Sequence, residues 1–68
     1  MRFLVMSDRL REARLRKGLT QEQLAEMAGL SVAHIGAVER GAKTPSLAAL
    51  YSICASLGVR MADVLAGE

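Results

Sequence analysis

The chain has 68 residues, which is enough for one small domain but not for two. About half of these residues (51%) are apolar, yet only Phe3 and Tyr51 are aromatic, a mixture that favours small, closely packed helices over a β-sandwich. Nine Lys and Arg residues against seven Asp and Glu residues give a net charge of +2, so the total charge alone identifies no partner.

The first predicted helix covers residues 8–17. Ser7 is a suitable N-cap, the segment itself is rich in the good helix formers Leu, Arg, Ala and Glu, and Gly18 ends it. Residues 1–6, MRFLVM, precede this helix as an extension whose role the pattern leaves open, with Met6 as an alternative start of translation. The extension lacks the long apolar stretch and the cleavage site of a secretory signal.

Residues 20–41 carry the most informative pattern, that of two short helices crossing at a tight turn. The first helix begins at Thr20 with Gln23 three residues later, a capping-box arrangement, and Gly29 can end it in the left-handed conformation. The second helix begins after its cap, Ser31. Leu24 and Ala28 are one turn apart on the first helix, and Ile35 and Val38 are one turn apart on the second. The apolar residues of the two segments are Leu24, Ala25, Ala28, Leu30, Ile35 and Val38. This spacing predicts a helix-turn-helix.

Two further helices complete the predicted fold. Pro45 fixes the backbone of a connector and Ser46 caps the fourth helix, which ends at Gly58. Apolar residues recur at helical spacing along it: Leu47, Leu50, Ile53, Cys54 and Leu57. A short fifth helix covers residues 61–65. The sequence therefore predicts an all-α fold of five short helices in a single domain, residues 1–68.

Cysteine usage and hydropathy predict a cytoplasmic protein. One cysteine, Cys54, excludes an internal disulfide framework and fits a reducing compartment. It falls on the apolar face of the fourth helix, which favours a buried, inert thiol over a redox switch. The longest uncharged run, residues 44–59, is too short to span a bilayer. One His and one Cys are too few ligands for zinc, so we expect no metal and no cofactor.

The motifs LREARLRKGLTQEQLAEMAGLS, I..VERG and PSL..L..I...LGV follow one another along the chain. In this order they resemble the phage-repressor and Cro type of helix-turn-helix domain, also called the xenobiotic-response-element family, over residues 8–65. The resemblance implies a lambda-repressor-like fold in which helices two and three form the helix-turn-helix. Residues 31–40 would then lie in the major groove of double-stranded DNA, and residues 20–28 would cross its backbone. Restriction–modification controller proteins and small phage-type repressors share this single-domain layout.

The resemblance also implies roles for individual residues. Those expected to face DNA bases are Ser31, Val32, Ala33, His34 and Ala37. Those expected at phosphates are Gln21, Arg40, Lys43, Thr44 and Ser46. Arg14 is expected to form a structural ion pair with Glu39. Among the base-facing positions only Ser31 and His34 offer side-chain hydrogen bonds, so we expect modest direct readout and a share of specificity from DNA shape.

Three features can be interpreted either with or without a functional role. His34 either contacts DNA or is simply solvated. Gly36, which weakens a helix by about 1 kcal/mol relative to alanine, is either tolerated or allows close approach to DNA. The cations of the first helix form either a phosphate-binding patch or a solvated face: Arg9, Arg11, Arg14, Arg16 and Lys17.

The sequence thus predicts a sequence-specific DNA-binding transcriptional regulator, such as a repressor or controller protein, that acts as a homodimer on operator half-sites. The predicted dimer interface consists of Val59, Met61, Val64 and Leu65, with residues 1–6 as the other candidate. The alternative is a protein-interaction or antitoxin-like module, which the apolar recognition helix favours. An enzyme is not expected, because the chain has no Ser/His/Asp set, no paired-carboxylate pocket and no glycine-rich phosphate loop. No small-molecule ligand and no membrane partner are expected.

Overall fold

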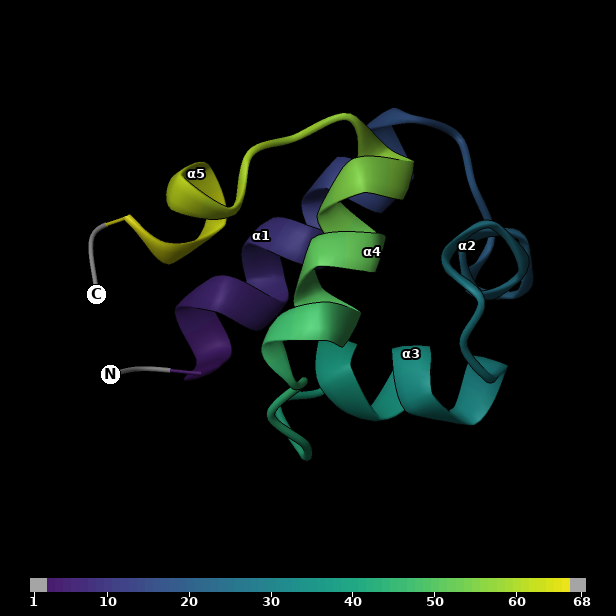
Figure 1. Ribbon diagram of the computed structural model, residues 1–68, viewed down its shortest axis with the longest axis horizontal. Coiled ribbons are helices and arrows are strands. Elements are labelled where there is room, and N and C mark those ends of the chain that lie inside the picture. Colours follow the sequence, from purple (N-terminus) through teal and green to yellow (C-terminus); the bar gives the residue numbers. More distant parts are fainter. Residues whose placement is uncertain (1–2, 67–68) are drawn as a thin grey trace.

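A computed structural model of the protein describes residues 3–66, with side chains from residue 5 onward. Within this range there are five helices and no strand: α1 (Phe3–Arg16), α2 (Gln21–Ala28), α3 (Val32–Glu39), α4 (Leu47–Leu57) and α5 (Met61–Leu65). In Figure 1, α4 runs down the middle of the molecule, with α2 and α3 on its right and α5 on its left. The predicted all-α fold of five helices is confirmed.

Local capping sets the starts of α2, α3 and α4. At Thr20 the capping box is complete, because the N–H of Gln23 donates to Oγ1 of Thr20 (3.0 Å) and the N–H of Thr20 donates to Oε1 of Gln23 (2.8 Å). The hydroxyls of Ser31 and Ser46 each accept the backbone N–H three residues later. Gly29 ends α2 with φ at 72°, a conformation that glycine adopts without strain.

The start of α1 differs from the prediction. The helix begins at Phe3, so Ser7 lies inside it and is not a cap. The Ser7 side chain is buried, and its hydroxyl donates to the carbonyl oxygen of Val38 at 2.6 Å, which joins α1 to α3. Met6, only 1% exposed, belongs to the core. Tertiary burial of these two side chains therefore outweighs the local preference of serine for a helix start.

One hydrophobic core joins all five helices. Its buried members are Met6, Leu10, Ala13, Leu24, Ala25, Ile35, Val38, Leu50, Ile53, Cys54, Leu57 and Val64. Val64 is only 3% exposed, so its side chain is used within this chain. The structure therefore removes Val64 from the predicted dimer interface, whereas its neighbour Leu65 stays partly exposed.

Cys54 lies in this core on α4. Its side chain is 2% exposed and it is a free thiol. Burial raises the pKa of the Cys54 thiol, because an apolar environment disfavours the thiolate. The residue thus behaves as a small apolar side chain.

α5 is attached to the rest of the domain through α1 and α4. Besides apolar packing, the guanidinium of Arg9 on α1 donates to the backbone carbonyls of Asp63 and Ala66 at the end of α5. Among the described residues, no helix is both long enough and apolar enough to cross a membrane.

Replacing Met6 with alanine tests whether the first turn of α1 is part of the core. Met6→Ala should lower the free energy of unfolding by about 3 kcal/mol, because it removes a fully buried side chain. Met27→Ala is the matched control, since Met27 on α2 is 54% exposed, and it should cost less than about 1 kcal/mol. Urea unfolding followed by circular dichroism measures both values. Equal midpoints for the two variants would contradict the placement of Met6.

Candidate nucleic-acid interface

The helix-turn-helix consists of α2, the turn at residues 29–31 and α3. The two helices contact each other, and Ala25, which is 5% exposed, provides a small side chain at their interface. The N–H of Leu30 donates to the carbonyl of Ala25 at 2.9 Å and closes the end of α2. Ile35 and Val38 on the inner face of α3 pack into the core, and each is 1% exposed. The orientation of α3 is thus set by the packing of these two residues on its inner face.

The opposite face of α3 is open to solvent and carries small side chains. Ser31, Val32 and Ala33 are exposed at its start, and His34 and Ala37 are partly exposed. All five predicted base-facing residues therefore lie on surface-accessible positions. The Oγ atom of Ser31 accepts the N–H of His34 at 3.0 Å, which leaves the hydroxyl proton of Ser31 free to donate.

His34 differs from a fully solvated side chain. Its Nε2 atom is buried and has no hydrogen-bond partner among the described residues. A buried polar atom without a partner is uncommon. A DNA contact by Nε2 would therefore require rotation of the His34 side chain.

The chain that follows α3 carries the predicted phosphate contacts. Arg40, Lys43, Thr44 and Ser46 are all exposed. The two ion pairs among the described residues are Arg14–Glu39 and Arg60–Asp63, so the charges of Arg40 and Lys43 are not neutralised by them. Ser46 also caps α4 through its Oγ atom.

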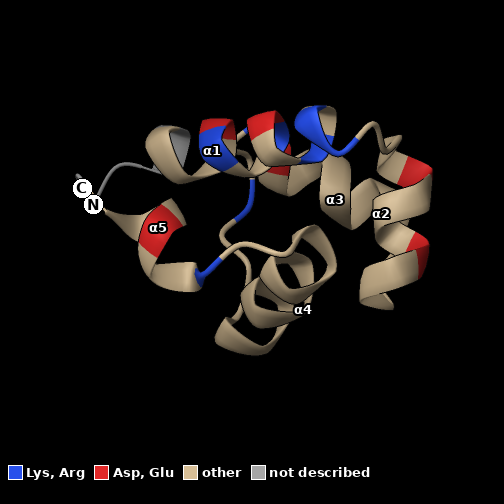
Figure 2. Ribbon diagram, turned by 90° about the horizontal axis from the view of Figure 1, so that it is seen from above, with Lys and Arg blue, Asp and Glu red and all other residues tan. Residues whose placement is uncertain are grey.

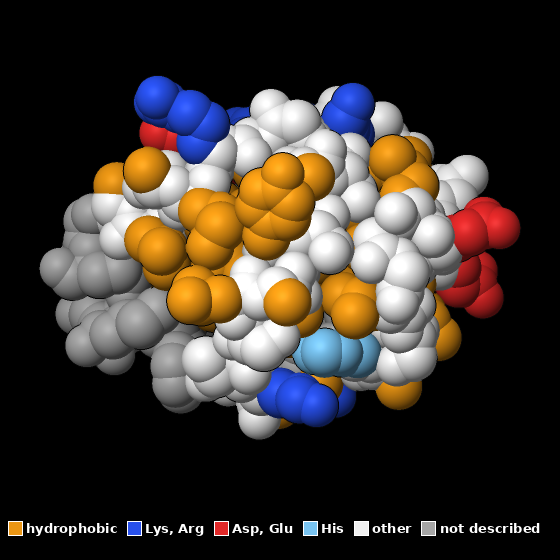
Figure 3. Space-filling model, viewed as in Figure 1, with side chains coloured by type: hydrophobic (Ala, Val, Ile, Leu, Met, Phe, Trp, Pro, Cys, Tyr) orange, Lys and Arg blue, Asp and Glu red, His pale blue; other side chains and the backbone are white. Residues whose placement is uncertain are grey.

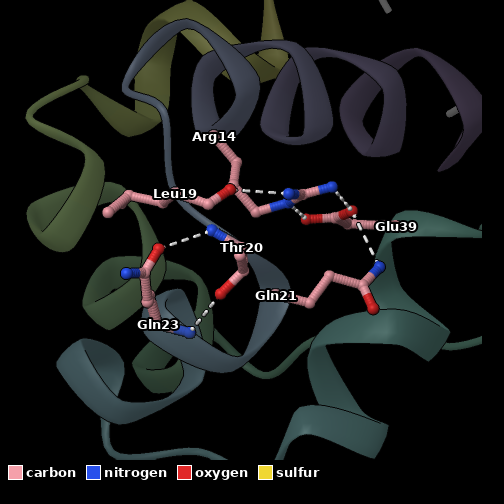
Figure 4. Close-up of polar contacts among 6 residues, drawn as sticks. All are labelled: Arg14, Leu19, Thr20, Gln21, Gln23 and Glu39. Carbon is pink, nitrogen blue, oxygen red and sulfur yellow. Dashed lines mark hydrogen bonds and ion pairs between the residues drawn. The ribbon is translucent and has the colours of Figure 1, made fainter.

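A buried ion pair connects α1 to the end of α3 (Figure 4). Arg14 donates from Nε to Oε2 of Glu39 at 2.7 Å and from Nη2 to Oε1 at 3.1 Å. A third nitrogen, Nη1, donates to the carbonyl of Leu19 at 2.7 Å. The side chains of the pair are 9% and 4% exposed. The structure thus brings together the two residues that the resemblance pairs. All three nitrogens of the Arg14 guanidinium have a hydrogen-bond partner.

Gln21, the first residue of α2, extends this network to the helix-turn-helix. Its Nε2 atom donates to Oε1 of Glu39 at 3.1 Å (Figure 4). An amide nitrogen has two N–H bonds, so one remains for the phosphate contact expected of Gln21. The N–H that donates to Glu39 holds the start of α2 against the end of α3.

The cations of α1 do not form a uniform positive surface. Arg14 is buried in its ion pair, and Arg9 donates to carbonyls of the α5 segment. Figure 2 shows acidic and basic segments alternating along α1. The remaining exposed cations are Arg11, Arg16 and Lys17. This mixture supports the reading of α1 as a solvated face rather than a phosphate-binding patch.

A hollow of about 370 Å³ lies between α4 and α5. Its lining residues are Tyr51, Cys54, Ala55, Val59, Arg60 and Met61. Val59 and Met61 belong to the predicted dimer interface, and both are partly exposed. Figure 3 shows apolar side chains gathered over this region of the surface.

Two large apolar residues of α4 are exposed. The helical spacing groups Leu47 with the buried residues of α4, but the structure places it on the surface, where it is 75% exposed, and Tyr51 is 66% exposed. With Ala55 they are spaced four residues apart, so they form one stripe along α4. The sequence contains the pattern for this stripe, because the apolar residues at positions 47, 51 and 55 fall on a different side of the helix from the residues that pack in the core.

The chain has extensive similarity to known helix-turn-helix proteins. The family model of HTH_3, described as helix-turn-helix, matches residues 10–64. The chain is 37% identical over 62 residues to the HTH-type transcriptional regulator DdrOP3 of Deinococcus deserti, which covers 91% of this chain and 48% of that protein. This chain therefore spans about half the length of that relative.

Solved structures show the same fold. The restriction-modification controller protein C.AhdI from Aeromonas hydrophila aligns with a TM-score of 0.89 and 35% identity, over 93% of this chain and 96% of that one. The clp gene regulator ClgR from C. glutamicum aligns with a TM-score of 0.88 and 38% identity, over 93% of this chain and 81% of that one.

Breaking the buried ion pair from one side should destabilise the fold strongly. Glu39→Ala leaves the guanidinium of Arg14 buried and unpaired, so the free energy of unfolding should fall by about 3 kcal/mol. The double variant Arg14→Met, Glu39→Leu removes both charges and should cost less than the sum of its single changes. Urea unfolding measures each variant.

The control for this experiment is Arg60→Ala, which breaks an ion pair whose side chains are 82% and 57% exposed. Its unfolding midpoint should stay close to that of the wild type, because exposed pairs contribute little. A midpoint of Glu39→Ala equal to that of Arg60→Ala would refute a structural role for the buried pair.

Proposed function

Because the chain belongs to the HTH_3 helix-turn-helix family of DNA-binding transcriptional regulators, we propose that it binds operator DNA sequence-specifically as a homodimer. The observation that carries this proposal is the arrangement of α3. Its inner face is fixed in the core, its outer face exposes Ser31, Val32 and Ala33 at the start of the helix, and exposed cations follow its C-terminal end. A rigid helix with such a face suits the major groove.

Direct base readout in this proposal is limited. Val32, Ala33 and Ala37 offer only apolar contacts, such as with the methyl group of thymine, whereas Ser31 and His34 offer hydrogen bonds. The bidentate contacts of Arg, Asn and Gln with guanine or adenine are missing from these positions. Sequence-dependent DNA shape therefore supplies a share of the specificity.

Affinity in this proposal comes mainly from the DNA backbone. The exposed charges of Arg40 and Lys43, with the hydroxyls of Thr44 and Ser46, act on phosphates beside the groove. Gln21 adds its remaining amide N–H from the start of α2. These contacts orient the domain on the duplex without reading its sequence.

The second copy of the chain covers the hollow between α4 and α5. Tyr51, Val59 and Met61 line it, and the exposed Leu47 on α4 and the partly exposed Leu65 on α5 add apolar surface on the same two helices. A surface of this kind can bind the same surface of another copy around a two-fold axis. Two recognition helices then reach half-sites about one DNA turn apart, and together they supply enough contacts for specific binding.

The outer face of α3 also supports a second candidate, a protein-interaction or antitoxin-like module. Val32 is 44% exposed and is followed by further small apolar residues, as in helices that dock in a protein groove. The two functions differ in their response to salt. DNA binding weakens steeply as salt rises, whereas an apolar protein interface responds little.

Selection of bound duplexes from a random DNA pool tests the proposed function. The wild type should enrich a site with two symmetric halves about one turn apart. Arg40→Ala and Lys43→Ala should weaken binding to all sequences about equally, and each should flatten the dependence of log Kd on log salt by about one unit.

Arg11→Ala is the matched control for these variants. It removes one positive charge from the exposed face of α1, which carries none of the proposed phosphate contacts and does not line the hollow, and should leave the salt slope unchanged. Failure of the wild type to enrich any sequence would reject operator binding. A change of preferred sequence in Arg40→Ala would make Arg40 a base-reading residue instead.

Placing a charge beside the hollow should split the dimer. Tyr51→Asp changes a side chain that is 66% exposed, so the monomer keeps its fold while the apolar surface is interrupted. Sedimentation at micromolar concentration should give a dimer for the wild type and a monomer for the variant. DNA affinity should fall with dimerisation, because one half-site supplies too few contacts.

Leu15→Asp provides the control for the dimer experiment, since Leu15 on α1 is 51% exposed but does not line the hollow. This variant should remain a dimer. Val64→Asp is unsuitable, because Val64 is in the core and a charge there would unfold the domain. A wild type that stays monomeric at high micromolar concentration would exclude this interface.

A further inference from the structure

Gly36 lies in the middle of α3, where glycine weakens a helix relative to alanine. It is nevertheless buried, and the atoms that cover it belong to two polar side chains. A Cβ atom added at Gly36 would lie 3.1 Å from Nη1 of Arg40 and 3.6 Å from Oε1 of Gln21. The space that a side chain would normally fill at this position is thus taken by a guanidinium from the end of α3 and an amide from the start of α2.

Helix geometry explains why Arg40 reaches this point. Long side chains on a helix lean toward its N-terminus and cover the residue four positions earlier. Arg40 caps α3 with helical backbone angles, φ −82° and ψ −6°, and the residue four positions earlier is Gly36. The guanidinium can therefore lie directly against the helix backbone. With a methyl group at this position, a contact of 3.1 Å would be too tight and the end of the Arg40 side chain would have to move.

The buried ion pair determines which end of the Gln21 amide faces this space. Nε2 of Gln21 donates to Oε1 of Glu39, and Arg14 fixes that carboxylate. The opposite end of the amide, Oε1, is the atom near Gly36. An acceptor oxygen rather than an NH₂ group thus lines the space beside Gly36, and this suits a guanidinium, which can only donate hydrogen bonds.

We propose that Gly36 is a positioning residue for Arg40, because it leaves room for the guanidinium to lie against the middle of the recognition helix before DNA binds. This inference rests on the proposed function, because it concerns the phosphate contact assigned to Arg40. A side chain that is already ordered loses less conformational entropy on binding. The glycine thus weakens α3 but preorganises a contact with the DNA backbone.

The substitution Gly36→Ala separates this role from a structural one. The variant should melt at the same temperature as the wild type or higher, because alanine is the better helix former and only a flexible side chain must move. Its DNA affinity should nonetheless fall by roughly 3- to 10-fold, the cost of ordering one long side chain on binding. Wild-type affinity in Gly36→Ala would overturn the inference.

A double-mutant cycle shows whether the loss acts through Arg40. In the Arg40→Ala background, Gly36→Ala should have no further effect on DNA affinity, because the side chain that it displaces is gone. An equal loss in both backgrounds would mean that the added methyl group obstructs DNA itself, and would overturn the inference.

NMR of the free protein tests the positioning without DNA. Side-chain protons of Arg40 should give NOEs to the Hα protons of Gly36 in the wild type. Their absence would overturn the inference whatever the binding data show. If the NOEs are present but the wild type binds no DNA, the proposed function fails while the contact between Arg40 and Gly36 stands.

Discussion

The buried pair of Arg14 and Glu39 is the interaction on which the geometry of the helix-turn-helix depends. Through it, α1 is tied to the end of α3, and its hydrogen bonds reach the α1–α2 loop at Leu19 and the first residue of α2 at Gln21. Burying two charges is costly unless their hydrogen-bonding groups are satisfied, and here three guanidinium nitrogens and both carboxylate oxygens have partners. Any shift of α3 relative to α1 would break several of these bonds together, so the pair restricts the domain to one arrangement.

The inner face of α3 stabilises the fold, and its outer face is the one that the proposed function uses for recognition. Ile35 and Val38 pack inward, and the carbonyl of Val38 also accepts the hydroxyl of Ser7. Small side chains on the outer face leave the helix backbone close to the surface. When a helix contacts DNA through such a face, its specificity depends less on single base contacts than on how closely the helix approaches the groove.

Features determined by neighbouring residues could be predicted from the sequence, and those determined by distant partners could not. The caps at Thr20, Ser31 and Ser46 act over three residues, so they set the helix starts as expected. Ser7 has the same local preference, but its hydrogen-bond partner lies 31 residues away, and the prediction of a helix start there was wrong. The burial of Val64 and the hydrogen bond of Gln21 with Glu39 likewise depend on packing between elements. The DNA-contacting and dimer-forming roles remain predictions for the residues that stay on the surface.

The placement of α1 and α5 bears on how this domain combines with others. The two helices contact each other, and Figure 1 shows the beginning of α1 and the end of α5 on the same side of the molecule, opposite α2. A polypeptide joined at either end would therefore be attached on the side of the molecule opposite α2. The domain can thus serve as a module in larger proteins of varied architecture, as its match to only 48% of the Deinococcus regulator illustrates.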